Sequence, residues 1–214
     1  KVVLKRNKNY WGEKPQVEQA TYIWRSESAV RAAMVKTGEA DIAPNIAVQD
    51  ANEPGMDYSF FNSETSRLRM DPTREPFTDW RVRLAANLAI DIEGMKGTIF
   101  SPDVVPMTQI VVPSINGHNH NLRQYGYDPE RAKNLFKKAG YCNGKQLMIP
   151  LTFRSNVPAD KLFALTWKAQ VDKDLSGCLS FTLEGIESTT IYRQLGKGAF
   201  EVVMLDWRGA YPDP

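Results

Sequence analysis

The chain has 214 residues, of which 42% are hydrophobic and 24% charged, as is usual for a globular protein with a substantial core. Its 27 basic and 25 acidic residues nearly balance and are mixed along the chain, so it lacks the concentrated basic field that nucleic-acid or membrane-surface binding needs. No apolar run reaches membrane-spanning length. Because the chain opens on Lys1 rather than Met and closes on Pro214 without a polar tail, we expect it to be a piece of a longer protein.

Short strands and one helix are predicted for the first third of the chain. Stretches rich in β-favouring side chains predict strands at 2–6, 20–25, 39–43, 57–61 and 66–70. The helix lies between the second and third of these strands. Ser26 can cap its start, and Gly38 can adopt the left-handed conformation needed at its end.

The most regular stretch covers residues 76–91 and predicts a helix with one buried face. Thr78 or Asp79 can accept hydrogen bonds from the unpaired backbone N–H groups of its first turn. Arg81 and Arg83 do not lie on the apolar face, so we expect the helix to be buried on one side and charged near its N-terminus. Apolar side chains recur at helical spacing at Val82, Ala85, Ala86, Ala89 and Ile90.

A short irregular helix around 92–100 leads into a long loop over 101–124. Long loops in compact domains are often functional, and this one holds both histidines, His118 and His120. An α-helical pair of metal ligands would need i, i+4 spacing, and no Cys, Asp or Glu stands beside the two imidazoles to complete tetrahedral ligation. We therefore expect a solvated loop, no metal site and no cofactor.

The second half of the chain has the pattern of an α/β unit. Asp128 at the N-cap and Pro129 at the first helical position begin a helix, which ends at Gly140. We expect an α/β fold in which a mixed sheet is flanked by helices. A β-α-β pattern, a further helix and a buried strand follow at 146–153, 158–175, 179–184, 187–195 and 200–205.

The two cysteines, Cys142 and Cys178, each precede a predicted strand of the β-α-β unit. Parallel neighbouring strands bring such positions close together, so a disulfide is geometrically feasible. Two separate reduced thiols are equally compatible with the sequence.

Five stretches resemble motifs of the family 5 extracytoplasmic solute-binding proteins, in the order in which that family shows them. Residues 76–91 are similar to its "PFxDxRVRxAxxxAID" signature, and residues 127–141 to its "YDPExAKxLxxxAGY". The other three motifs, "RNPxYWG", "GEADI" and "WxxDYPDP", correspond to residues 6–12, 38–42 and 207–214. The resemblance therefore covers nearly the whole chain.

The resemblance implies the second lobe of a two-lobed, hinged, periplasmic-binding-protein-like fold. Residues 1–16 would lead from the first lobe, 17–205 would form the ligand-binding lobe, and 206–214 would be the hinge and ligand-loop segment. It implies a monomeric, non-enzymatic component of an ABC importer that captures a small molecule by hinge closure and delivers it to a membrane permease. The protein would be periplasmic or extracellular, with lipoprotein anchoring as one option. A hydrolase with an unrecognised carboxylate pair and a chaperone-like module are the alternatives.

Two positions are the main candidate ligand contacts. Arg154 ends a strand that the β-α-β pattern makes parallel, where open α/β sheets bind ligands, and its guanidinium can fork onto a carboxylate or phosphate. In the family's dipeptide binders, an Arg at the corresponding place grips the ligand carboxylate. Trp207 can form a flat wall for an apolar or sugar ligand, and Tyr211 is a weaker candidate of the same kind. The alternatives are a surface Arg and a core Trp.

The last turn departs from the family pattern. In the family's peptide binders, an Asp three residues after the Trp pairs with the α-ammonium of the ligand, whereas the third residue after Trp207 is Ala210. A buried ammonium without its carboxylate costs about 2–5 kcal/mol, and Arg208 would add repulsion. We expect a ligand without a free peptide N-terminus, such as an anionic sugar or an opine-like compound. An oligopeptide is the alternative, if Asp206 or Asp213 replaces the lost carboxylate.

Overall fold

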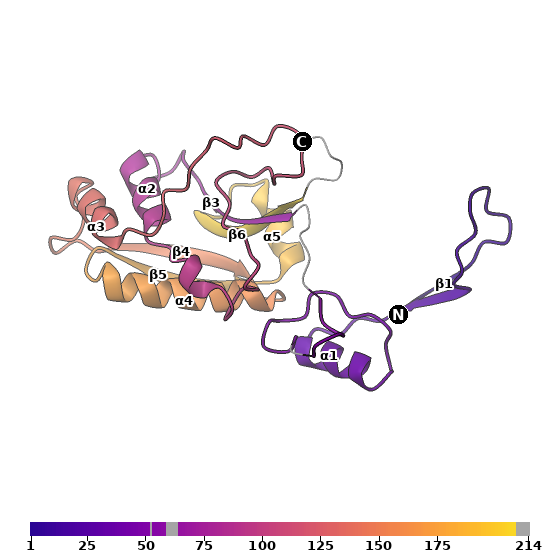
Figure 1. The fold of residues 1–214 in the computed structure, drawn as a ribbon. Coiled ribbons are helices and arrows are strands. Elements are labelled where there is room, and N and C mark those ends of the chain that lie inside the picture. The colour runs from indigo at the N-terminus through magenta and orange to yellow at the C-terminus, as the bar shows by residue number, and fades with distance from the viewer. Residues whose placement is uncertain (52, 59–63, 209–214) are drawn as a thin grey trace. The chain divides into compact units, whose positions relative to one another are not determined.

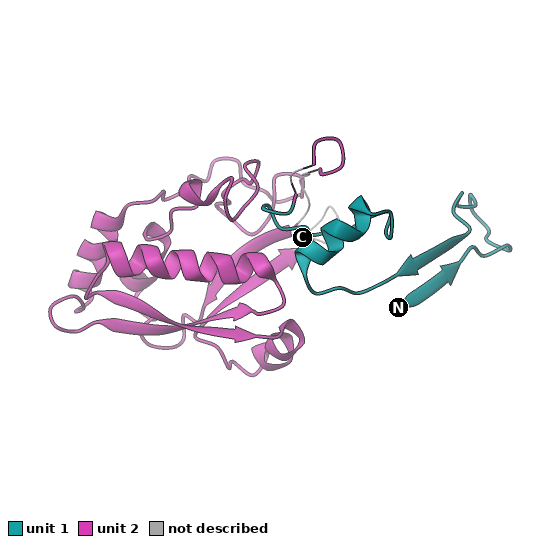
Figure 2. Cartoon of the chain, turned by 90° about the horizontal axis from the view of Figure 1, so that it is seen from below, with its two compact units in different colours: residues 1–50 teal, residues 51–214 magenta. Residues whose placement is uncertain are grey.

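The computed structural model describes residues 1–51, 53–58 and 64–208. The chain divides into two compact units, residues 1–50 and residues 51–214 (Figure 2). Each unit has its own secondary structure.

The smaller unit holds a two-stranded antiparallel ribbon and one helix. β1 (Val2–Lys5) pairs with β2 (Gln19–Tyr22), and α1 (Ser28–Lys36) follows. Gly38 has φ of 76°, the left-handed conformation that ends a helix without steric cost only for glycine. The two predicted strands and the helix are confirmed, with ends shifted by a few residues. The predicted cap is wrong, because Glu27 rather than Ser26 is the N-cap and its side chain makes no capping hydrogen bond.

The larger unit is built on a four-stranded mixed sheet in the order β3-β6-β4-β5 (Figure 1). β4 runs parallel to both β5 and β6, whereas β3 is antiparallel to β6. The expected mixed sheet is confirmed, and the carboxyl ends of β4 and β6 lie at the same edge. The strands are β3 (Glu64–Met70), β4 (Leu147–Arg154), β5 (Leu179–Ile186) and β6 (Val202–Arg208).

Helices flank the sheet, as predicted. Asp79 and Asp128 cap two of them, because their carboxylates accept hydrogen bonds from the backbone N–H groups of Arg81 and Arg131 at 2.8 and 2.9 Å. The Asp128 N–H donates to the Leu88 carbonyl at 2.9 Å, which joins the start of α3 to the end of α2. The helices are α2 (Trp80–Leu88), η1 (Glu93–Met95, 3-10), α3 (Pro129–Lys138), α4 (Pro158–Asp174) and α5 (Ser188–Leu195).

Side chains of β6 alternate between two hydrophobic clusters, one on each face of the sheet. Met204 belongs to the main core, whereas Val203 and Leu205 pack with Ile191 of α5 in a smaller cluster. This alternation follows from the two-residue period of a strand. Each face of the sheet therefore carries apolar side chains that helices cover, which is the layered arrangement that the element order predicts.

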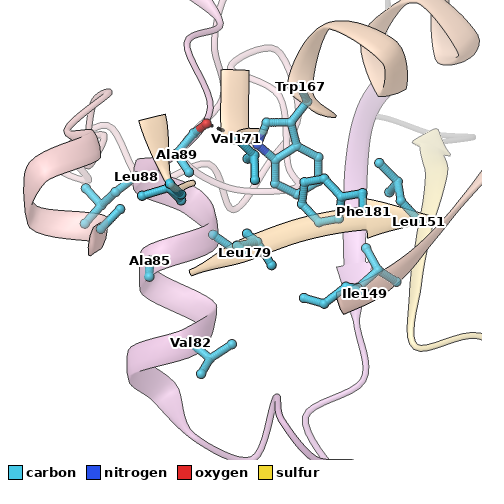
Figure 3. Packing of buried hydrophobic residues seen from close by; sticks show 14 of the residues in the cluster. Val82, Ala85, Leu88, Ala89, Ile149, Leu151, Trp167, Val171, Leu179 and Phe181 are labelled. Carbon is cyan, nitrogen blue, oxygen red and sulfur yellow. Dashed lines mark hydrogen bonds between the residues drawn. The ribbon is translucent and has the colours of Figure 1, made fainter. Parts of the chain in front are cut away.

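The main core centres on Trp167 of α4 (Figure 3). Its indole ring lies 4.3 Å from the ring of Phe181 between centroids, and its indole N–H donates to the Ala89 carbonyl at 3.1 Å. The carbonyl at the end of α2 is thus satisfied by a side chain of α4, as buried polar groups require. The predicted buried face of α2 is confirmed at Val82, Ala85, Ala86 and Ala89, and Leu88 is buried with them.

The strand predicted at 39–43 is wrong. These residues form no strand, and the Ala40 N–H instead donates to the Met34 carbonyl at 3.0 Å. The stretch therefore completes the C-terminal end of α1. The strand predicted at 57–61 falls largely outside the described residues, since 59–63 are among those left out.

The structure joins Cys142 and Cys178 in a disulfide, with their Cα atoms 3.9 Å apart. Cys178 immediately precedes β5, and its carbonyl accepts a hydrogen bond at 2.9 Å from the N–H of Leu147, the first residue of the neighbouring strand β4. The bridge thus ties the amino-terminal ends of two parallel strands together.

Candidate ligand-binding site

Arg154 is the last residue of β4, at the edge of the sheet where parallel strands end. It is only 6% exposed, so it is not the surface arginine that was the alternative. Loops and helix starts that follow such strand ends form the usual binding edge of open α/β sheets. The position expected for a ligand contact is therefore occupied by a largely desolvated guanidinium.

Two carboxylates neutralise this guanidinium. Asp160, in the first turn of α4, accepts from Nε at 2.6 Å and from Nη2 at 3.0 Å, the bidentate geometry that Arg favours with carboxylates. Asp206 of β6 lies 2.9 Å from Nη1. Burial works against the charged form, but the hydrogen bonds and charges of Asp160 and then Asp206 outweigh it and raise the pKa of Arg154.

The two carboxylates differ in their access to solvent. Asp160 is 3% exposed, whereas the Asp206 side chain is 23% exposed and also accepts a hydrogen bond from the Tyr192 hydroxyl at 2.7 Å. Burial alone would raise the pKa of Asp206, but the Tyr192 hydroxyl and the Arg154 charge outweigh it and lower that pKa to about 2. Asp206 is thus ionised at neutral pH and forms the outward side of the cluster.

By formal charge, one guanidinium and two carboxylates give the Arg154–Asp160–Asp206 cluster one net negative charge, and Glu64 also interacts with Asp206. Asp160 binds Nε and Nη2 of the guanidinium, so an external anion would approach Nη1 on the Asp206 side. The cluster can therefore exchange one carboxylate for another, or attract a cation. Its chemistry is that of ion-pair binding.

The remaining predicted site residues lie at or beyond the end of β6. Trp207 is half-buried and pairs with Thr65 of β3, so it belongs to the strand itself. The backbone of Arg208 pairs with Glu64. Ala210 and Tyr211 lie outside the described residues. The structure thus brings Arg154 and the end of β6 together through Asp206.

Sequence reasoning missed Asp160 and Tyr192 as partners of this cluster. The usable signal is spacing: Asp160 follows Arg154 by six residues, across the turn that joins β4 to α4. An acidic residue in the first turn of a helix is also favoured by the helix dipole. Tyr192 carries no comparable signal, because its proximity depends on how α5 packs against β6.

The two histidines of the long loop lie side by side, with ring centroids 4.6 Å apart. His118 Nδ1 makes a 2.7 Å hydrogen bond with the Val111 carbonyl. Within residues 1–51, 53–58 and 64–208, no group of three or more His, Cys, Asp or Glu side chains is arranged to hold a metal ion. In the same part of the chain, no helix has the length and hydropathy of a membrane span.

Curated relatives align with most or all of this chain. A nickel-binding periplasmic protein of Escherichia coli K12 is 27% identical and covers 99% of this chain and 44% of the relative. A glutathione-binding protein of Escherichia coli is 33% identical over 67% of this chain and 29% of the relative. The chain thus spans less than half the length of these relatives.

Solved structures share the fold. An oligopeptide-binding protein from Borrelia burgdorferi superimposes with a TM-score of 0.84 at 23% identity, covering 99% of this chain and 43% of that protein. The binding protein AgaA from A. tumefaciens, solved with agropinic acid, gives 0.82 at 22% identity and covers 99% and 43%. The mixed sheet with flanking helices is therefore the architecture of part of a periplasmic binding protein.

The family model "Bacterial extracellular solute-binding proteins, family 5 Middle" matches residues 1–214. It describes proteins that bind solutes rather than transform them, in agreement with the expected class. This chain belongs to family 5 of the bacterial extracellular solute-binding proteins.

Proposed function

We propose that this chain forms the ligand-binding second lobe of the substrate-binding component of an ABC importer. The observation that carries the proposal is the Arg154–Asp160–Asp206 cluster at the carboxyl edge of β4 and β6, with Asp206 on its outward side. In this proposal the protein is a periplasmic or extracellular monomer, lipid-anchored or free. It closes over a small molecule and presents it to a membrane permease, with no bond made or broken.

The ligand we propose carries an anionic group and no free peptide N-terminus. Its carboxylate or phosphate would displace Asp206 and share Arg154 with Asp160. Asp206 already accepts from Tyr192 and lies beside the Arg154 guanidinium, so its charge is partly offset before any ligand ammonium arrives. Ala210 offers no carboxylate in its place. Trp207 and Tyr211 would supply the walls of the pocket, with Arg208 beside them.

A second candidate ligand is an oligopeptide, and the net negative charge of the cluster favours it. A ligand ammonium near Asp206 would neutralise that charge without removing any carboxylate from Arg154. An anionic ligand would displace Asp206, whereas a peptide ammonium would pair with it. Removing the Asp206 charge should therefore affect the two ligands in opposite directions, and this difference can be measured.

The test is calorimetric titration of the product of the complete gene, wild type and Asp206→Asn. The ligands are di- to pentapeptides, their N-acetylated forms, and an opine or sugar phosphate. If an anion displaces Asp206, the D206N variant binds it about tenfold more tightly, because a competing charge has gone. N-acetylated and free peptides then bind equally weakly.

The matched control is Asp103→Asn, an exposed carboxylate in the 101–124 loop, which should leave every affinity unchanged. If free peptides bind tightly, and if acetylation or the D206N substitution abolishes that binding, the ligand is an oligopeptide and the proposal of an anionic ligand is wrong. Chemical conversion of any bound compound would contradict the binding function itself and point to the hydrolase alternative.

A further inference from the structure

A group of arginines lies on the larger unit along β3, the edge strand of the sheet. An open pocket of about 450 Å³ is lined there by Arg67, Leu68, Arg69, Met70, Pro72, Arg83 and Ile110. Three of these seven residues are arginines and none is acidic. So dense a group of like charges costs free energy unless an anion or solvent screens it.

The three arginines come from two elements. Arg67 and Arg69 alternate along β3 and so share one face, while Leu68 and Met70 pack against the main core. Arg83 comes from α2, where its Nη1 donates to the carbonyls of Phe77 and Thr78. The pairing of β3 with β6 fixes the backbone positions of Arg67 and Arg69, and the two hydrogen bonds fix the guanidinium of Arg83.

Arg67 carries the observation that points to a ligand. Its Nη1 is shielded from solvent and has no hydrogen-bond partner among the described residues. A buried guanidinium N–H without an acceptor costs about 1–3 kcal/mol or more, so natural structures nearly always supply an acceptor. No oxygen of the described residues supplies one to this atom, whereas an anion in the pocket would do so once the Arg67 side chain turned toward it.

The nearest acidic residue after the strand, Asp71, interacts mainly with groups outside the pocket. Asp71 accepts from the Thr73 hydroxyl at 2.7 Å and pairs with Arg74 at 3.4 Å. The hydrogen bonds from Thr73, and then the charges of Arg74 and Arg69, lower the pKa of Asp71. Its carboxylate is therefore held mainly by Thr73 and Arg74, and it offsets only part of the Arg69 charge.

We infer that this pocket binds a multiply charged oxyanion of the phosphate class, held between Arg67, Arg69 and Arg83. Guanidinium groups match such oxygens in a planar, bidentate fashion, and three of them suit a ligand with two or more negative charges. The Arg154 cluster is a different site, because neither Arg154 nor its partners Asp160 and Asp206 line this pocket.

The test is calorimetric titration of the 214-residue chain and of the complete gene product with inorganic phosphate and pyrophosphate. Ionic strength is held constant with sodium chloride in a zwitterionic buffer. We expect saturable 1:1 binding, tighter for pyrophosphate, with a rise in melting temperature. Arg67→Gln should weaken it at least about tenfold, and exposed Arg69→Gln about threefold.

Arg123→Gln removes an exposed arginine outside the pocket and should bind as wild type does. Arg67→Lys keeps the charge but loses the fork, so it should lie between wild type and R67Q. If R67Q does not fold, the binding affinity of R69Q tests the inference instead, because Arg69 is exposed and its replacement should leave the fold intact. Absence of saturable binding by the wild type, or equal binding by R69Q and R123Q, would overturn the inference.

Discussion

At the carboxyl end of β4, the charge of Arg154 is balanced by two carboxylates of different burial. Asp160 is fixed by two hydrogen bonds in the interior, and Asp206 faces outward. A buried charge that loses one partner is strongly destabilised, whereas an outward partner can be exchanged at lower cost. The division of roles follows: Asp160 positions the guanidinium, and Asp206 occupies the place that we propose for the ligand.

The stability that Asp206 contributes should depend on pH. Its pKa is lowered to about 2, below the ordinary value, so its contribution is fully present above about pH 5 and is lost as pH falls through 2. Asp206→Asn should therefore reduce the free energy of unfolding by about 1–2 kcal/mol at pH 7, and by about half as much at pH 3. Urea unfolding at both pH values measures it.

Asp103→Asn serves as the exposed control for this series and should change stability by less than about 0.5 kcal/mol at either pH. If D206N changes the free energy of unfolding by the same amount at pH 7 and pH 3, the charge of Asp206 does not contribute to stability through its ion pair with Arg154.

The position of Arg154 could be predicted from the sequence, but its surroundings could not. A strand followed by a helix places its last residue at the binding edge whatever the side chains are. Which carboxylates reach the guanidinium depends on the start of α4 and on the packing of α5 against β6. These are tertiary distances, and no local pattern encodes them.

At the scale of elements, the helices with both a cap and an apolar face were the most predictable. α3 begins at Pro129 after Asp128, and Gly140 follows it with φ of 91°, each as the sequence indicates. The stretch 39–43 failed because a strand needs a neighbour, and the backbone there is used to close α1. Local propensity is outweighed when no partner strand is available.

The junction of α2, α4 and β5 depends on Trp167. Its ring is 1% exposed, so Trp167→Ala should lower the free energy of unfolding by about 3–5 kcal/mol through the cavity it leaves. Trp167→Phe keeps most of the volume but loses the bond to the Ala89 carbonyl, and should cost about 1–3 kcal/mol. Chemical unfolding with tryptophan and circular dichroism signals measures both.

Trp80→Phe is the matched control, since Trp80 is 58% exposed on the same unit. Its effect should stay within about 0.5 kcal/mol. A W167A variant as stable as W80F would mean that the core is organised around other residues.

The disulfide should stabilise the larger unit by restricting its unfolded chain. Cys142 and Cys178 are 36 residues apart, and a loop of that length corresponds to about 3–4 kcal/mol in the chain-entropy model. Unfolding with and without reductant should differ by about this amount. The double variant Cys142→Ala/Cys178→Ala should match the reduced protein and show no response to reductant. Equal wild-type stability in both conditions would contradict a stabilising bridge.

At the scale of the whole molecule, the chain spans less than half of the relatives it matches. A cleft that closes over a ligand covers most of the ligand's surface, and in our proposal this chain supplies only one of the two lobes. We therefore expect the 214-residue chain to bind the transported ligand at least about a hundredfold more weakly than the complete gene product. Calorimetry with one ligand on both proteins measures the ratio, and equal affinities would mean that a single lobe suffices.

The most direct distinction between a solute-binding protein and an enzyme is that the former binds a small molecule and releases it chemically unchanged. Native mass spectrometry of the freshly purified complete gene product should find one small molecule bound per protein chain. Denaturation should release that molecule, and re-addition to the stripped protein should restore the same complex with its mass unchanged after hours of incubation. A protein that retains no small molecule and converts the added compound to products would contradict a binding function.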